Sequence, residues 1–122
     1  MTRDAFAGRL DISVLRENGA TVVRGEGEVD LDTADQLATA LRGAVDESGG
    51  LVVLDLLGVP FMDSSGLKVL LVASADLGDR LALAISPGSP VMTLLEIAEV
   101  RDRFAIHGTP LEAIAAGDRD SE

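Results

Sequence analysis

Residues 51–85 read LVVLDLLGVPFMDSSGLKVLLVASADLGDRLALAI. The run at 51–54 is continuously apolar and rich in β-branched residues, which predicts a central strand buried on both faces; GVP at 58–60 is expected to end it. DSSG at 63–66 then opens an apolar helical period, and residues 80–85 form a second apolar run. Strand, helix and strand in this order predict a parallel sheet with helices packed on it.

The segment before this unit predicts an antiparallel hairpin. Apolar and polar residues alternate over 10–14, and the Asn-Gly pair at 18–19 suits the positive φ angles of a tight turn. Residues 21–29 are expected to return as the partner strand. The glycines in GEG at 25–27 favour a bulge or a closely packed neighbour.

Helical signals fill the rest of the chain. Asp32 or Thr33 is expected to cap the first helix, and Thr33 with Gln36 fits the spacing of a capping box. SPGSP at 86–90 predicts a cap and a first-turn proline for a third helix. The expected apolar stripes of these three helices are Leu37, Leu41, Ala44 and Val45; Leu67, Leu70, Leu71 and Ala75; and Val91, Leu94, Leu95 and Ala98.

The C-terminal segment predicts a short strand over 104–106 and a capped helix over 111–116, followed by a polar tail at 117–122. The expected fold is therefore α/β, a small mixed sheet that begins with an antiparallel hairpin and continues with parallel strands, with about four helices. We expect a single domain over 1–122, with its core at about 9–116.

Composition excludes several classes of function. Lys plus Arg number 10 against 21 Asp plus Glu, a formal net charge of −11, and the aromatic residues are three Phe. This acidic, aromatic-poor chain lacks the basic groove or stacking platform of a nucleic-acid-binding protein, and anionic membranes would repel it. With no Cys and one His, thiolate chemistry and His- or Cys-based metal sites are not expected.

No targeting or membrane segment is expected. MTRDAF at 1–6 lacks the apolar region of a secretory signal, and the longest apolar stretch, 67–75, is far shorter than a membrane span. The absence of Cys is compatible with a reducing compartment. We therefore expect a soluble cytoplasmic protein without membrane contact.

FMDSSGL, residues 61–67, places two hydroxyls where a strand-to-helix loop meets a helix start. Free backbone N–H groups and the positive end of the helix dipole make this position receptive to an anion such as a phosphate. Gly66 would let a partner approach the backbone beside Ser65. The alternative is that Asp63, Ser64 or Ser65 only caps the helix and that Gly66 is incidental.

FMDSSGL resembles the phosphorylation motif of anti-anti-sigma factors, the stand-alone bacterial members of the STAS (sulfate transporter and anti-sigma factor antagonist) domain family. GEVD at 27–30, followed by a helix start near Thr33, resembles the second signature of the same family. LDL at 54–56, then Val59, resembles the sequence that precedes its serine motif. The element order agrees over about 9–116, and the paired motifs at this separation make the resemblance specific.

The resemblance implies a non-enzymatic switch. In that family the second Ser of the motif, here Ser65, is phosphorylated by the anti-sigma factor itself, a serine kinase that supplies the ATP, so no cofactor is expected. The unphosphorylated form binds the anti-sigma factor and frees a sigma factor, whereas phosphorylation breaks that complex and a PP2C-type phosphatase resets it. Asp30 matches the motif aspartate near the phosphorylation site, and Asp63 precedes the acceptor pair.

Beside Ser65, the second helix carries a candidate docking face. Val69 and Val72 are apolar but lie outside the predicted core stripe, so they form either a contact patch or simply more buried surface. The family usually has Gly where Lys68 stands. This cation can pair with the phosphate or with an acidic loop of the partner.

The sequence also leaves room for other functions. A STAS-like accessory subunit of a transporter or lipid-trafficking complex would use the Ser motif as a docking surface alone. Asp55 invites comparison with a phosphoaspartate receiver, but the acidic pair and Lys of receivers are missing, so we expect a loop or cap role. Asp30, Asp32 and Asp35 lack calcium-loop spacing and are expected at a helix start, and His107 in a surface loop.

Overall fold

The computed structural model describes residues 9–120, apart from the side chains of residues 46–48 and 118–120. The N-terminal segment 1–6 and the last two residues of the expected tail lie outside the described residues. The elements in chain order are β1 (Leu10–Glu17), β2 (Ala20–Val29), α1 (Ala34–Ser48), β3 (Val52–Met62), α2 (Ser64–Leu77), β4 (Leu81–Ala84), α3 (Pro90–Ile97), β5 (Ala105–His107) and α4 (Pro110–Asp120). Short 3-10 helices, Gly78–Arg80 and Arg101–Arg103, precede β4 and β5.

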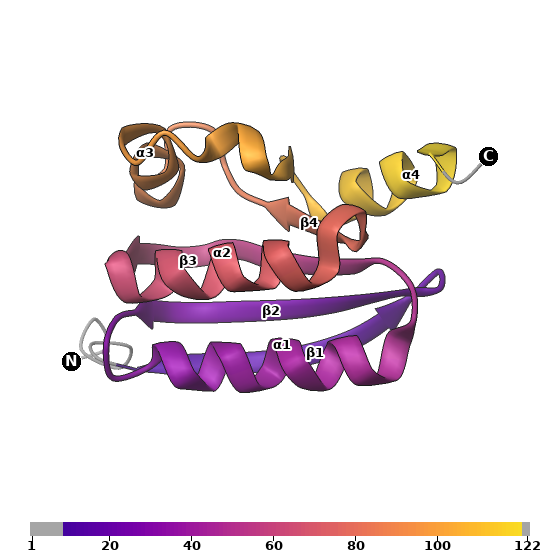
Figure 1. The fold of residues 1–122 in the computed structure, drawn as a ribbon, viewed down its shortest axis with the longest axis horizontal. Helices are drawn as coiled ribbons and strands as arrows, with labels where there is room; N and C mark the ends of the chain where they lie inside the picture. Colours follow the sequence, from indigo (N-terminus) through magenta and orange to yellow (C-terminus); the bar gives the residue numbers. More distant parts are fainter. Residues whose placement is uncertain (1–8, 121–122) are drawn as a thin grey trace.

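The sheet has five strands in the order β1-β2-β3-β4-β5 (Figure 1). The first pair is antiparallel and the other three pairs are parallel. Each parallel connection passes through a helix, as a strand–helix–strand crossover requires. The predicted mixed α/β sheet is confirmed.

The hairpin between β1 and β2 follows from its turn residues. Asn18 and Gly19 both have positive φ, 52° and 83°, which matches the twist of the flanking strands. Glycine is also required at position 27, where a Cβ would collide with the backbone carbonyl of Arg9. The predicted turn and the predicted close approach at this glycine are confirmed.

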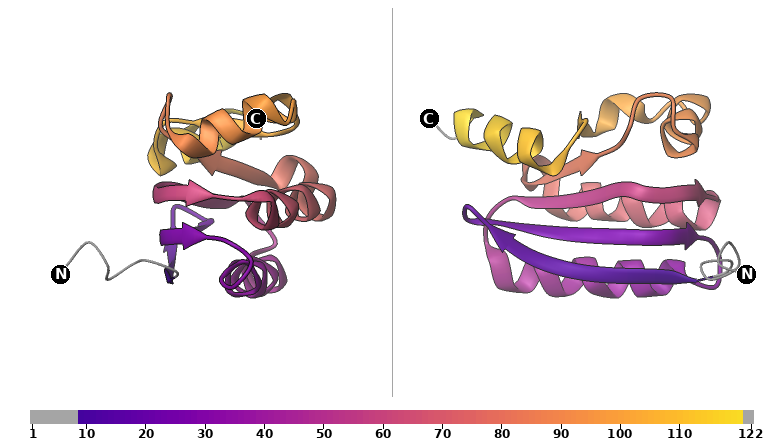
Figure 2. Two further views of the ribbon diagram at one scale, coloured as in Figure 1. Left: turned by 90° about the vertical axis from the view of Figure 1, so that its left-hand side faces the viewer. Right: turned by 180° about the vertical axis from the view of Figure 1, so that it is seen from behind.

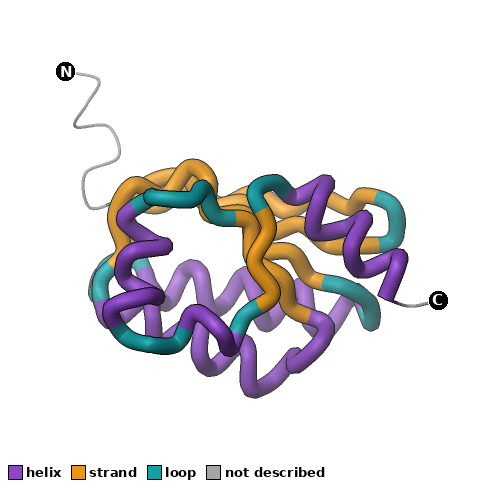
Figure 3. The backbone as a smooth tube through the Cα atoms, turned by 90° about the horizontal axis from the view of Figure 1, so that it is seen from above, coloured by secondary structure: helices purple, strands orange, loops and turns teal. Residues whose placement is uncertain are grey.

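The helices divide between the two faces of the sheet. Figure 2 shows α1 and α2 side by side on one face, and α3 packs on the same apolar layer through Val91 and Leu95. On the other face α4 covers a smaller cluster: Ala20, Val22, Val53, Ala82, Ala84, Ala113 and Ile114. Seen from above, α3 and α4 lie at opposite ends of the β4–β5 edge (Figure 3). Val52, Val53 and Leu54 are fully buried between the two layers, as predicted for a central strand.

The expected break at 58–60 was wrong, because β3 continues through it to Met62. Two irregularities in the β2–β3 register, between Arg24 and Glu26 and between Glu26 and Glu28, accommodate this segment. Gly58 pairs with Glu26, and a Cβ there would lie 2.9 Å from the Glu26 Cγ. Glycine and proline therefore mark bulges in this strand and not its end.

Asp55 was expected in a loop or cap, but it lies inside β3 with its side chain 5% exposed. Its Oδ2 accepts a 3.0 Å bond from Arg24 Nε, and its Oδ1 accepts one of 3.0 Å from Leu57 N. His107 was expected in a surface loop but is the last residue of β5, where its carbonyl accepts from Ile85 N. Both residues belong to the sheet because strand pairing continues past the apolar runs.

Helix faces and ends differ in detail from the prediction. The buried side of α2 is Gly66, Leu70, Ala73 and Leu77, whereas the expected core residue Ala75 is exposed. Ala98 is likewise exposed, as the residue that caps α3. The last helix continues to Asp120, past the expected start of the tail, because Gly117 packs on Leu51: a Cβ there would lie 2.9 Å from Leu51 Cδ2. No helix within residues 9–120 is long and apolar enough to cross a membrane.

Candidate functional site

The carboxyl ends of β2 and β3 bring the two predicted aspartates to one edge of the sheet. Val29 and Met62 are paired in the last register position of these strands. The backbone N–H of Asp63 then donates a 3.0 Å bond to the Val29 carbonyl, directly before Asp30. Parallel pairing is what places Asp30 and Asp63, far apart in sequence, at the same end of the sheet.

Asp63 is the N-cap of α2. Its Oδ1 accepts a 2.8 Å hydrogen bond from the Ser65 N–H, and its backbone is extended, with φ −106° and ψ −168°. The first turn of α2 contains no acidic residue, so Asp63 is the charge that faces the positive end of the helix dipole. The predicted helix start at the DSSG motif is confirmed, with Asp63 as the residue that caps it.

The two candidate acceptors differ in their surroundings. Ser64 is exposed, whereas Ser65 is partly buried and lines a groove between α1 and α2. Within residues 9–120, neither hydroxyl makes a hydrogen bond. Both serines are therefore free to react, but only Ser65 adjoins the groove.

Gly66 has a different role from the one expected. It is buried, and a Cβ there would lie 2.5 Å from Met62 Cγ and 2.7 Å from Val29 Cγ1. The glycine faces the interior, so it does not open the backbone to a partner. It lets α2 start directly against the ends of β2 and β3, which fixes the height of Ser65 above the sheet.

Thr33 is the N-cap residue of α1, one of the two residues predicted there, but Asp30 supplies the side-chain bonds to this helix start. Asp30 Oδ1 accepts from the N–H groups of Asp32 and Thr33 at 3.0 and 3.1 Å. Thr33 makes no side-chain cap bond; its hydroxyl donates to the Glu28 carbonyl at 2.8 Å and accepts from Asp30 N at 2.9 Å. The predicted capping box with Gln36 is therefore wrong. Thr33 is buried against β2, where its hydroxyl bonds back to the strand.

The groove between α1 and α2 has a volume of about 520 Å³. From α2 it is lined by Ser65, Lys68, Val69, Val72, Ala73, Asp76 and Leu77, and from the other side by Leu31, Ala34, Asp35, Ala38, Leu41, Arg42 and Val45. Val72 is 52% exposed and Leu31 is 79% exposed, so the rim is apolar and open. Val69 is partly buried, which places it in the groove wall.

The sequence prediction missed the α1 side of this groove. Leu31 was detectable as a lone apolar residue between two aspartates, a placement that is unusual for a helix-start loop. Arg42 and Asp35 had no such signal, because their position opposite α2 depends on how the two helices pack. Within the described residues, no group of three His, Asp or Glu side chains is arranged to hold a metal ion.

This fold is that of a known class. The STAS domain family matches residues 11–113, and the chain belongs to it. Anti-sigma-F factor antagonist RsfB from Mycobacterium tuberculosis is 28% identical over 106 residues, covering 86% of this chain and 87% of RsfB.

Solved structures agree with that placement. The crystal structure of an anti-sigma factor antagonist from Mycobacterium paratuberculosis superposes with a TM-score of 0.84 at 25% identity, covering 92% of this chain and 97% of the other. The Bacillus cell fate determinant SpoIIAA, in its phosphorylated form, shares the fold with a TM-score of 0.62 at 20% identity, covering 87% and 98% of the two chains.

Proposed function

We propose that this chain is an anti-sigma factor antagonist switched by phosphorylation of Ser65. The observation that carries the proposal is the position of Ser65: second residue of α2, beside the cap formed by Asp63 and at the edge of the α1–α2 groove. The 28% identity to RsfB supports the same class of function. A role as a transporter accessory subunit has no comparable support.

Ser65 is favoured over Ser64 as the acceptor because of what a phosphate would change at each position. A phosphoserine carries about −1.5 to −2 charges and three strong acceptor oxygens. At Ser65 this charge enters the groove beside Lys68 and Val69. At Ser64, which is exposed and outside the groove, the same charge would be largely solvated.

The proposed cycle uses the groove as the contact surface for an anti-sigma factor that is also a serine kinase. In the unphosphorylated chain, the apolar rim around Val72 and Leu31 is exposed and available to the anti-sigma factor. A phosphate on Ser65 adds charge and hydration there and meets the carboxylate of Asp63, so the complex separates. A PP2C-type phosphatase then restores the binding form. The kinase brings the ATP, and the chain itself needs no cofactor.

Intact mass after incubation with ATP and the partner kinase tests this proposal. We expect one phosphoryl group on the wild-type chain and on Ser64→Ala, and none on Ser65→Ala. Ser64 is the matched control because it is the same residue type, one position away and outside the groove. Phosphorylation that persists in Ser65→Ala, or no phosphorylation of the wild type by any anti-sigma kinase of the source genome, would refute it.

A further inference from the structure

A second pocket lies at the end of the sheet opposite to the end that carries Ser65. It has a volume of about 960 Å³ and lies at the amino ends of the parallel strands, beneath α4. Its wall is formed by the hairpin turn, by the segments that lead into β3, β4 and β5, and by Ile114 and Gly117 of α4. Five segments of the chain that are distant in sequence therefore converge on one concave surface.

Arg80 is held at the wall of this pocket with part of its guanidinium unsatisfied. Its Nε donates a 3.0 Å bond to the Gly50 carbonyl, which fixes the side chain. Its Nη2 is buried and has no hydrogen-bond partner in the described part of the chain. Thr21 Oγ1 is the other buried side-chain atom without a partner in the described part of the chain, but Thr21 does not line the pocket.

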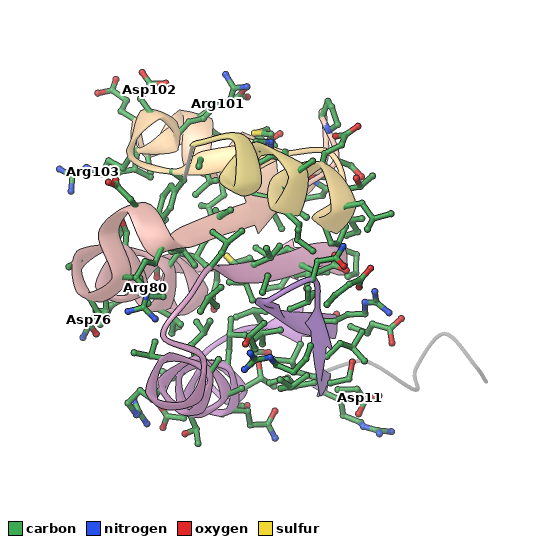
Figure 4. The ribbon with its side chains drawn as sticks, turned by 90° about the vertical axis from the view of Figure 1, so that its right-hand side faces the viewer. Asp11, Asp76, Arg80, Arg101, Asp102 and Arg103 are labelled. Atoms are coloured by element: carbon green, nitrogen blue, oxygen red, sulfur yellow. The ribbon has the colours of Figure 1, made fainter. Side chains whose placement is uncertain are left out.

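An unsatisfied guanidinium nitrogen is unfavourable, because burial removes water without replacing its hydrogen bonds. Guanidinium groups bind carboxylate and phosphate oxygens with particular strength. Arg103 lines the same pocket, and neither arginine forms an ion pair with the residues described here. Figure 4, which looks onto this edge, shows Arg80 and Arg103 on the same side of the molecule and Arg101 pointing away.

We propose that this pocket binds a small molecule that carries a carboxylate or phosphate group. The volume lies in the range of small-molecule sites, about 300–1,000 Å³. Four large apolar residues are part of the lining and would contact the uncharged body of the ligand: Leu51, Leu81, Phe104 and Ile114. Asp79 is an acidic residue of the same lining, so a singly charged head group fits better than a polyanion.

This site is independent of the proposed phosphorylation switch. Ser65 follows the carboxyl end of β3, whereas the pocket lies where β3 and β4 begin. No residue of the pocket lining also lines the α1–α2 groove. Failure of one proposal therefore leaves the other intact.

Amide chemical shifts measured by NMR during titration test the proposal on the full chain. The probes are inorganic phosphate and the monocarboxylate butyrate, with sodium chloride at matched ionic strength as the reference. We expect saturable shifts at Gly50, Gly78 and Phe104 that chloride does not reproduce, and the two probes tell which head group is preferred. Equal responses to all three salts would overturn the proposal.

Two adjacent arginines supply the matched variants. Arg103 lines the pocket, whereas Arg101 is also exposed and belongs to the same 3-10 helix but does not line the pocket. We expect Arg103→Gln to raise the Kd by up to about fivefold, Arg80→Gln by about 10- to 100-fold, and Arg101→Gln to leave it unchanged. If Arg80→Gln does not fold, the comparison of the Kd values of Arg103→Gln and Arg101→Gln still tests the proposal. Equal weakening by both of these would show nonspecific charge attraction and refute the site.

Discussion

The carboxylate of Asp63 accepts a 2.8 Å hydrogen bond from the backbone N–H of Ser65. The residue before the serine pair thus positions the proposed phosphoacceptor through the backbone and leaves its hydroxyl free. One short contact links the start of α2 to the chemistry that we propose for it.

Removing this cap is expected to cost stability. Asp63→Ala loses the bond to Ser65 N and should lower the free energy of unfolding by about 0.5–2 kcal/mol, measured by urea denaturation. Asp63→Asn keeps a side-chain oxygen in the same place and should remain within about 0.5 kcal/mol of wild type. Equal losses in both variants would mean that charge, and not the hydrogen bond, stabilises this helix start.

Charge at Ser65 is expected to act locally. Ser65→Glu should weaken binding to the anti-sigma factor at least about tenfold, because it places a carboxylate in a contact groove. The loss of affinity should persist at about 1 M salt, where the Debye length is about 3 Å and long-range charge interactions are screened. Ser64→Glu changes the net charge equally and should have a much smaller effect. Recovery of Ser65→Glu in high salt would indicate long-range repulsion instead.

Gly66 is expected to tolerate no side chain. A Cβ there meets Met62 and Val29, so Gly66→Ala should destabilise the fold by about 1–3 kcal/mol despite the better helix propensity of Ala. Gly43→Ala is the control, since nothing lies within 4 Å of a Cβ at that position in α1. The free energy of unfolding of Gly43→Ala should rise by about 0.4–1 kcal/mol. Thermal unfolding of both variants measures the contrast, and a neutral Gly66→Ala would contradict the packing described here.

Val72 is expected to contact the partner. Val72→Asp should weaken anti-sigma factor binding at least about tenfold without unfolding the chain, because the side chain is 52% exposed at the groove rim. Ile97→Asp is the matched control, on a residue 76% exposed at the end of α3 and outside the groove. Isothermal titration calorimetry compares the two. Similar losses in both variants would place the contact surface elsewhere.

Arg24 and Asp55 are expected to be energetically coupled. Their 3.0 Å contact joins a side chain that is 44% exposed to one that is 5% exposed, next to the β3 bulges. A double-mutant cycle with alanine should give a coupling of about 0.5–2 kcal/mol. The same cycle on Arg9 and Asp11, which are 3.5 Å apart and both more than half exposed, should give nearly none. Equal coupling energies for the two pairs would show that burial of Asp55 does not strengthen its interaction with Arg24.

Local sequence rules predicted the elements that depend on neighbours along the chain. The Asn18-Gly19 turn requires positive φ, and the apolar run 51–54 has to be buried, so both were readable without the fold. The predicted ends of β3 and α4 were wrong because these ends depend on contacts with residues far away in the sequence. β3 passes through Gly58 and Pro60 because Glu26 pairs beside them, and α4 continues past Gly117 because Leu51 packs on it.

The amino-acid sequence by itself determined the mixed sheet, the helix start at DSSG and the resemblance to the STAS family, since each rests on residue order and local period. Tertiary structure alone decided which residues meet. Parallel pairing of β2 with β3 brings Asp30 beside Asp63, and packing of α1 on α2 builds the groove at Ser65. Convergence of four connections places Arg80 and Arg103 in one pocket. Such contacts join residues far apart in the chain, and local propensity carries no information about them.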